Sequence, residues 1–136
     1  MVLDTSIVFK WLLNGNEPNR DAALNIIQDF LHSKIDVAIP DFLYIEVANI
    51  LATKSSVKER QLKESLDLLF SFNMNVYEIT DSDVKEAAIL AKEHKQTVYD
   101  MLFVVLAKRL KTTLLTADTK FFTATKFPFI KLLSRM

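Results

Sequence analysis

Residues 97–118 read TVYDMLFVVLAKRLKTTLLTAD and combine one predicted helix with one predicted strand. The apolar residues 101–107 are too few to cross a membrane, so they indicate a helix that lies inside a protein core. Residues 113–116 have the composition of a buried strand. Asp100 lies early in the predicted helix, and Asp118 directly follows the predicted strand. Two acids therefore accompany a largely apolar segment.

The rest of the chain repeats this alternation of short apolar runs and longer stretches with helical spacing. The pattern is typical of an α/β fold with a central, mostly parallel sheet of four to five strands. The predicted strands are residues 2–3, 37–39, 76–79, 113–116 and, at an edge, 129–132. The predicted helices are residues 6–13, 18–33, 41–53, one after 55–56, 80–93 and 97–110, with a helical turn through 121–122. No linker or repeat divides the 136 residues, so we expect one domain, 1–136.

The predicted helices differ in how much of their surface is apolar. Helix 41–53 is expected to be buried on two sides, with Glu46 about a turn and a half from its start. The next helix is expected to pack one face inward through four apolar residues, Leu62, Leu66, Leu69 and Phe70. Thr80 and Asp83 have the spacing of a capping box, which predicts a purely structural role for this acid.

The composition excludes several classes of function. The chain has no cysteine, which removes disulfides, thiolate metal sites and cysteine nucleophiles. Its single glycine, Gly15, excludes glycine-rich nucleotide-binding loops. The first residues lack a basic leader and a cleavage site, and no apolar run reaches the roughly 18 residues of a membrane helix. We therefore expect a soluble, cytoplasmic protein that does not enter a membrane.

The charges are unevenly distributed although the net charge is zero. Residues 1–83 contain 7 Lys or Arg and 13 Asp or Glu, whereas residues 84–136 contain 10 and 4. The cations of the second half include Lys108, Arg109, Lys111, Lys120 and Lys126. Such asymmetry fits a basic rim beside an acidic site, and it fits equally well an ordinary solvated surface.

Four acids lie where the surrounding pattern favours apolar residues: Asp4, Glu46, Asp100 and Asp118. None is expected on a wet face, and burying an unpaired charge costs several kcal/mol unless something neutralises it. Asp4 and Asp118 follow predicted strands, and ligand sites of parallel sheets lie outside the carboxyl ends of the strands. Four converging carboxylates require a compensating cation, and oxygen ligands without thiolates favour Mg²⁺ or Mn²⁺.

Each acid also has a structural explanation to be weighed against a catalytic one. Asp4 and Asp118 have the positions of helix N-caps. Thr97 and Asp100 have the spacing of a second capping box. Glu46 lies beyond easy reach of a cap and would otherwise need a Lys or Arg partner. Position alone leaves both explanations open for the two strand-end aspartates.

Four short segments together resemble the motifs of the PIN-domain family, in the order in which that family carries them. They are Leu3-Asp4-Thr5-Ser6, Glu46-Val47-Ala48-Asn49, Val98-Tyr99-Asp100 and Leu114-Leu115-Thr116-Ala117-Asp118. The match spans nearly the whole chain, and its length is similar to that of the toxin ribonucleases of VapBC-type toxin–antitoxin pairs. Each motif is weak alone, whereas four in register are specific.

The resemblance implies a three-layer α/β/α fold and a metal-dependent endoribonuclease. It assigns Asp4, Glu46, Asp100 and Asp118 as catalytic and Mg²⁺- or Mn²⁺-binding acids. It places Thr5, Ser6 and Thr116 as neighbouring hydroxyls. Some members carry a further acid after the last one, where this chain has Thr119-Lys120, so a complete second metal site is in doubt.

The same resemblance implies partners and leaves other functions to be compared. The expected partners are an RNA substrate, a cognate antitoxin whose peptide lies across the site, and a second copy of the chain in a homodimer. The alternative is a catalytically silent PIN-like module that binds RNA or protein. A phosphatase or phosphoacceptor using Asp4 is a further alternative, but the second nearby acid of such enzymes is missing.

Overall fold

The computed structural model describes residues 1–13 and 15–136, and its centre is a parallel sheet of five strands. The strand order is β3-β2-β1-β4-β5, and every neighbouring pair is parallel. The strands are β1 (Val2–Leu3), β2 (Ala38–Pro40), β3 (Asn75–Tyr77), β4 (Leu114–Thr116) and β5 (Ile130–Leu132). The predicted α/β class with a parallel sheet is therefore confirmed. The predicted bounds of β1 match, and those of the other strands differ by one or two residues.

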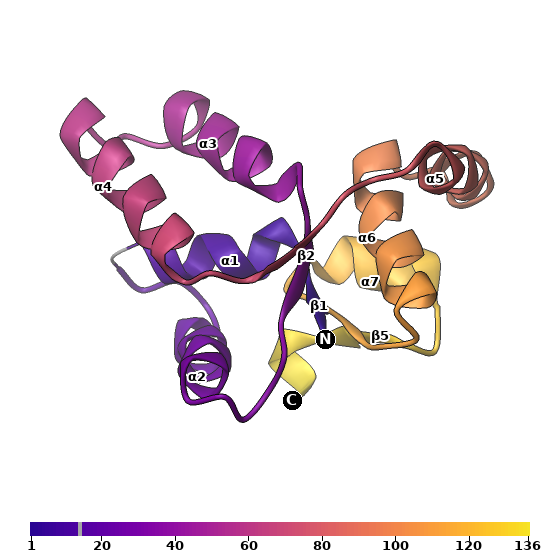
Figure 1. Cartoon of the computed structure of the whole chain (residues 1–136), viewed down its shortest axis with the longest axis horizontal. Helices are drawn as coiled ribbons and strands as arrows, with labels where there is room; N and C mark the ends of the chain where they lie inside the picture. The colour runs from indigo at the N-terminus through magenta and orange to yellow at the C-terminus, as the bar shows by residue number, and fades with distance from the viewer. Residues whose placement is uncertain (14) are drawn as a thin grey trace.

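Helices cover both faces of this sheet. They are α1 (Thr5–Leu12), α2 (Arg20–Leu31), α3 (Leu43–Thr53), α4 (Glu59–Ser71), α5 (Asp81–His94), α6 (Val98–Arg109) and α7 (Thr119–Thr125), and a short 3₁₀ turn, η1 (Leu133–Arg135), follows β5. Helices α1 to α4 lie on one side of the sheet, and α5 to α7 lie on the other (Figure 1). This follows from right-handed crossovers, because the chain first moves outward from β1 to β3 and then returns through β4 to β5. The result is the expected three-layer arrangement.

Helix α6 forms the centre of the core. Residues Met101–Ala107 are all buried, as their apolar run predicts. The helix packs on β1, β2 and β4 and is covered on its outer side by α5. None of the helices within residues 1–13 and 15–136 combines the length and apolar character that crossing a bilayer requires.

Three details of helices α3 and α4 differ from the expectation. Helix α3 is buried on one side only, through Leu43, Val47 and Leu51, whereas Ile45 is 72% exposed. The helix also begins at Leu43, so Glu46 lies in its first turn and not a turn and a half inside. On α4, Leu69 is buried but Phe70 is half exposed and packs edge-on against Tyr44. Helical spacing shows that a face is apolar, but it does not show which neighbour covers that face.

The capping box at the start of α5 is confirmed. Asp83 N donates to Thr80 Oγ1 (3.2 Å), and Thr80 N donates to Asp83 Oδ2 (3.0 Å). The same carboxylate, only 7% exposed, accepts from Arg109 Nη1 at 2.7 Å. Asp83 therefore joins the start of α5 to the end of α6 in addition to capping its own helix.

Replacing Asp83 with Ala is expected to lower the free energy of unfolding by about 2 to 3 kcal/mol. The change removes half of a capping box and leaves Arg109 without its buried carboxylate. The measurement is urea denaturation of Asp83→Ala beside Asp81→Ala, which removes an exposed acid of the same helix turn. Equal stability of these two variants would contradict the structural role of Asp83.

Candidate active site

Asp4 and Asp118 stand side by side at the carboxyl edge of the sheet. They follow the neighbouring strands β1 and β4, and Asp4 N donates to Leu115 O at 3.3 Å. Both carboxylates cap helices, as their positions predict. Asp4 Oδ1 accepts from the backbone amides of Ser6 (3.0 Å) and Ile7 (3.3 Å), and Asp118 Oδ1 accepts from Phe121 N (2.9 Å). The bonds that cap the helices use only Oδ1 of each carboxylate, so Oδ2 of each takes no part in capping.

Glu46 is held by a hydroxyl group on a different helix. Thr5 Oγ1, in the first turn of α1, donates to Glu46 Oε2 at 2.5 Å. This bond ties the start of α3 to the start of α1 across 41 residues of sequence. A buried glutamate would otherwise need a Lys or Arg partner. No Lys or Arg forms an ion pair with Glu46 within residues 1–13 and 15–136. Glu46 is therefore oriented without being neutralised.

Asp100 lies in the first turn of α6, but its carboxylate does not complete a capping box. Thr97 Oγ1 accepts from Asp100 N at 3.1 Å, which is the first half of such a box. The reciprocal bond from Thr97 N to the Asp100 carboxylate is not found in the described chain, unlike the corresponding bond at Asp83. The structural explanation therefore accounts for the threonine and leaves the acid group of Asp100 unexplained.

Two hydroxyl groups connect the strand-end aspartates. Ser6 Oγ donates to Asp4 Oδ1 and accepts from Ala117 N at 2.8 Å. Thr116 Oγ1 lies 3.5 Å from Ser6 Oγ and accepts from Asp118 N at 3.0 Å. The segment after β4 is thereby fixed to the segment after β1. Thr5, Ser6 and Thr116 thus all contact the acids or their backbone.

The four acids share a position relative to helices. Asp4 and Asp118 are the N-caps of α1 and α7, and Glu46 and Asp100 lie in the first turns of α3 and α6. Unpaired backbone amides and the helix dipole make each helix start partly positive. Several such ends directed at one place favour carboxylates there, and they favour a phosphate group equally.

Burial raises the pKa values of three of the acids, and repulsion between carboxylates adds to this shift at two of them. Burial raises the pKa of Asp4 to about 6, and the hydrogen bonds from Ser6 only partly oppose this. Burial raises the pKa of Glu46, and the charge of Asp100 raises it further. Burial also raises the pKa of Asp100, to which the charge of Asp118 adds. The charges of Glu46, Asp100 and Asp118 therefore repel one another. Without a metal ion, this repulsion is lowered when one of these carboxylates takes up a proton.

The exposure of the acids differs from the expectation that all four lie away from water. Asp4 is 9% exposed and Glu46 and Asp100 are half-buried, but Asp118 is exposed. Asp118 lies where the chain leaves the sheet, and the apolar residues before it belong to the strand and not to its own surroundings. The exposure of the acids thus increases from the buried Asp4 to the exposed Asp118.

The chemistry of the site fits a hard divalent cation, but the side chains are not preassembled around one. Within the described ranges, no three Asp, Glu, Cys or His side chains lie close enough together to hold one ion. The available donors are carboxylate and hydroxyl oxygens, which Mg²⁺ and Mn²⁺ prefer. Burial raises the pKa values of Asp4, Glu46 and Asp100, and the charge of a neighbouring acid raises those of Glu46 and Asp100 further, so a cation would stabilise the ionised forms. A cation therefore fits these donors provided that side-chain rotation brings the carboxylates together.

The basic rim expected beside the acids is only partly present. Lys108 pairs with Glu86 and Arg109 pairs with Asp83, both on α5. These two cations lie at the end of α6, about 13 Å along the helix from Asp100 at 1.5 Å per residue. Lys111 follows them at the same end of the helix. Lys120 is exposed in α7 two residues after Asp118, whereas Lys126 is the C-cap at the opposite end of that helix.

An aromatic pair beside the acids was not predicted from the sequence. Tyr99 immediately precedes Asp100 and is 60% exposed. Its ring meets Phe42 edge-on, with centroids 6.0 Å apart, and Phe42 O accepts from Glu46 N at 3.1 Å. The only signal in the sequence was the position of Tyr99 next to an acid.

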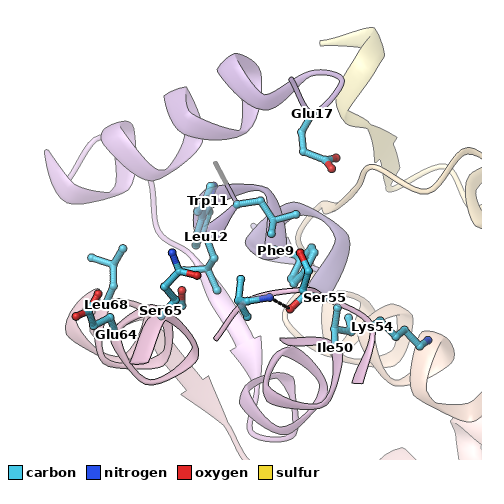
Figure 2. Close-up of a pocket in the computed structure, with 14 residues that line it drawn as sticks. Phe9, Trp11, Leu12, Glu17, Ile50, Lys54, Ser55, Glu64, Ser65 and Leu68 are labelled. Carbon is cyan, nitrogen blue, oxygen red and sulfur yellow. Dashed lines mark hydrogen bonds between the residues drawn. The ribbon is translucent and has the colours of Figure 1, made fainter. Parts of the chain in front are cut away.

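A separate pocket lies away from the four acids, between α1, α3 and α4 (Figure 2). Its volume is about 840 Å³, and its apolar side includes Phe9, Leu12 and Leu68. Glu17, Lys54 and Glu64 line its polar parts, but none of the four acids does. The pocket therefore offers a binding surface without the chemistry of the acidic site.

Comparison with known proteins gives one match at the level of sequence families. The family model described as PIN domain matches residues 1–127, which is most of the chain. No curated protein sequence matches the chain.

Several solved structures have a similar fold. A toxin-antitoxin complex from Klebsiella pneumoniae is 19% identical with a TM-score of 0.69, covering 97% of this chain and 96% of that one. VapC20 from Mycobacterium tuberculosis, described as a toxin that cleaves the sarcin-ricin loop, is 16% identical with a TM-score of 0.71, covering 96% and 98%. FitAcB from Neisseria gonorrhoeae is 17% identical with a TM-score of 0.65, covering 99% of both chains. At identities below 25%, these likenesses concern the fold alone.

Proposed function

This chain belongs to the PIN-domain family, and we propose that it is a metal-dependent endoribonuclease acting as the toxin of a toxin–antitoxin pair. One observation carries the enzymatic part of the proposal. Asp4, Glu46 and Asp100 have raised pKa values, and no Lys or Arg within the described chain pairs with them. Buried carboxylates without a positively charged partner lower the stability of the fold. Such groups are concentrated at functional sites.

A divalent cation, Mg²⁺ or Mn²⁺, is the cofactor that suits these groups. Asp4, Glu46, Asp100 and Asp118 would hold it, and Thr5, Ser6 and Thr116 would keep the carboxylates in place. When bound, the cation supplies a water of lowered pKa and offsets charge on the scissile phosphate. Thr119 and Lys120 provide no further acid after Asp118, so the proposal requires one cation and does not depend on a second.

The residues of the chain have separate roles in this proposal. Glu46, oriented by Thr5, directs the attacking water and accepts its proton, which its raised pKa favours. The dipole of α1, whose start lies at the site, favours the negative charge that develops on the phosphate. Lys120 contacts the RNA backbone. Cleavage by an attacking water leaves a 5′-phosphate on one product.

The role as a toxin rests on the structural neighbours. Two of them are toxins or toxin complexes by their descriptions, and they match this chain over nearly its full length. From these descriptions we extend to this chain an antitoxin partner, and we add to the proposal a homodimeric state and a cytoplasmic location. A short reading frame upstream of the gene that encodes a small DNA-binding protein would support the pairing.

A catalytically silent PIN-like module that binds RNA or protein is the second candidate. The observation in its favour is that no three acidic side chains of the described residues are preassembled around an ion. Metal affinity separates the candidates, because a silent module keeps its acids without binding a cation usefully.

The test is cleavage of end-labelled single-stranded RNA by the purified full chain with millimolar Mn²⁺ or Mg²⁺. Expected are fragments carrying a 5′-phosphate, no cleavage in excess EDTA, and recovery when the metal is restored. Cleavage that persists unchanged in EDTA contradicts the metal-dependent mechanism. RNA binding without cleavage at any metal concentration supports the silent module instead.

A further inference from the structure

We propose that Tyr99, supported by Phe42, is a stacking platform for an unpaired base of RNA beside the acidic site. The inference rests on the proposed function, because it takes RNA as the substrate. Tyr99 belongs to the first turn of α6 and directly precedes Asp100. Its ring is 60% exposed although the helix behind it is the most buried of the fold.

The ring of Tyr99 is supported from the core outward. Phe103 is 2% exposed and meets Phe42 edge-on, with centroids 5.2 Å apart and planes at 67°. Phe42 in turn meets Tyr99 at 6.0 Å and 65°. Three rings thus lead from the core to the surface, which restricts the motion of the outermost ring. An aromatic side chain fixed in this way loses little conformational freedom when it binds a flat partner.

Tyr99 and Phe42 both lie beside acids of the site. Tyr99 is the neighbour of Asp100 on α6, and Phe42 lies one turn before Glu46 at the start of α3. The starts of α3 and α6 approach each other at the same end of the molecule (Figure 1). An RNA strand whose phosphate lies at Glu46 and Asp100 therefore has a flanking base within reach of Tyr99.

The chemistry of an exposed aromatic ring selects the form of the RNA more than its sequence. Every base has a flat face, so stacking tolerates all four bases. Bases inside a duplex already stack on their neighbours and gain nothing from the ring, whereas bases in a loop or a single strand are free to do so. The expected substrate class is therefore an unpaired segment, which fits the proposed endoribonuclease.

A protein partner is the competing occupant, because aliphatic side chains also stand near this position. Ile45 is 72% exposed and Val98 is 36% exposed. The aromatic chain from Phe103 to Tyr99 favours RNA, since an exposed ring that is supported by other rings suits a base. The oligomeric state of the variants distinguishes the two occupants.

The experiment measures RNA binding by the full chain carrying Asp4→Asn, so that the RNA is bound without being cut. The probes are a twelve-nucleotide oligouridine and the same backbone with abasic sites at its centre. Tyr99→Leu is expected to weaken binding of the first probe about 5- to 100-fold and to leave the second unchanged. Tyr99→Phe keeps the ring and is expected to bind both probes as the parent does.

The matched control is Phe70→Leu, which removes another exposed aromatic ring. Phe70 is 48% exposed and packs edge-on against Tyr44 at 5.0 Å, outside the contacts of the four acids. Its loss is expected to leave both affinities unchanged. A second measurement uses Tyr99→Trp, because the one native tryptophan, Trp11, is 5% exposed in the core. Binding of oligouridine, but not of the abasic probe, should quench the fluorescence of the new tryptophan.

The outcomes separate this inference from the proposed function. RNA bound through Tyr99 but never cut with Mn²⁺ supports the platform and overturns the nuclease. RNA cut by Tyr99→Leu with the KM of the parent overturns the platform and keeps the nuclease. Absence of any RNA binding overturns both. The platform is also overturned if Tyr99→Leu weakens both probes equally or acts by changing the oligomeric state in light scattering.

Discussion

Replacing Asp4 with Asn is expected to reduce Mn²⁺-dependent RNA cleavage by more than about 100-fold, while the fold stays intact. Loss of a residue that only supports a metal ligand typically costs 10- to 100-fold, so loss of a ligand should exceed this range. Asn keeps an oxygen acceptor for the cap of α1, and it removes the charge that would hold a cation. The measurement is the initial rate of cleavage at saturating Mn²⁺, with circular dichroism to confirm the fold.

The prediction extends to Asp100 and has a matched control. Asp100→Asn is expected to give a similar loss, because that carboxylate serves no capping box. Asp67→Asn changes an exposed aspartate of α4 and is expected to cleave RNA at the parental rate. If both Asp4→Asn and Asp100→Asn cleave as fast as Asp67→Asn, these acids are not the catalytic site.

The position of the acids could be inferred from the sequence because it depends on local chain geometry. Asp4 and Asp118 follow apolar strands, and parallel strands bring their carboxyl ends to one edge of the sheet. Glu46 and Asp100 interrupt apolar runs, which made them conspicuous. The structure places all four at helix starts on this side, while their role in binding a metal stays a prediction.

The family resemblance placed Thr5, Ser6 and Thr116 near the acids, but the individual contacts depend on packing between distant segments and could not be inferred. The contact of Arg109 with Asp83 joins residues 26 apart, so the cation that was expected to serve the site is used to fix α5 on α6. Thr5 and Glu46 are 41 residues apart, and only the packing of α1 on α3 brings them together. The exposed side of α3 was misjudged for the same reason, because the sequence does not show that Ile45 is left 72% exposed by the packing of the other segments.

Without metal, the stability of the protein is expected to fall as the pH rises from about 4 to 7, and removal of the Asp4 charge should abolish part of this fall. The pKa of Asp4 is about 6 in the folded chain, against an ordinary value of 3.8 for an aspartate in water. Between these values the unfolded chain releases the proton that the folded chain still holds, so folding loses free energy as the pH rises. Two pKa units correspond to roughly 3 kcal/mol. Burial raises the pKa values of Glu46 and Asp100 as well, and these act in the same direction.

The measurement compares urea denaturation of the parent and Asp4→Asn at several pH values in EDTA. The variant should gain stability relative to the parent as the pH rises from about 4 to 6 and should keep that gain above pH 6, because Asn has no proton to lose. Adding Mg²⁺ at about 100 times its Kd should restore about 3 kcal/mol to the parent at pH 7 and much less to the variant. Parallel stability curves, or an equal effect of Mg²⁺ on both proteins, would show that the charge of Asp4 is neither costly in the fold nor relieved by a cation.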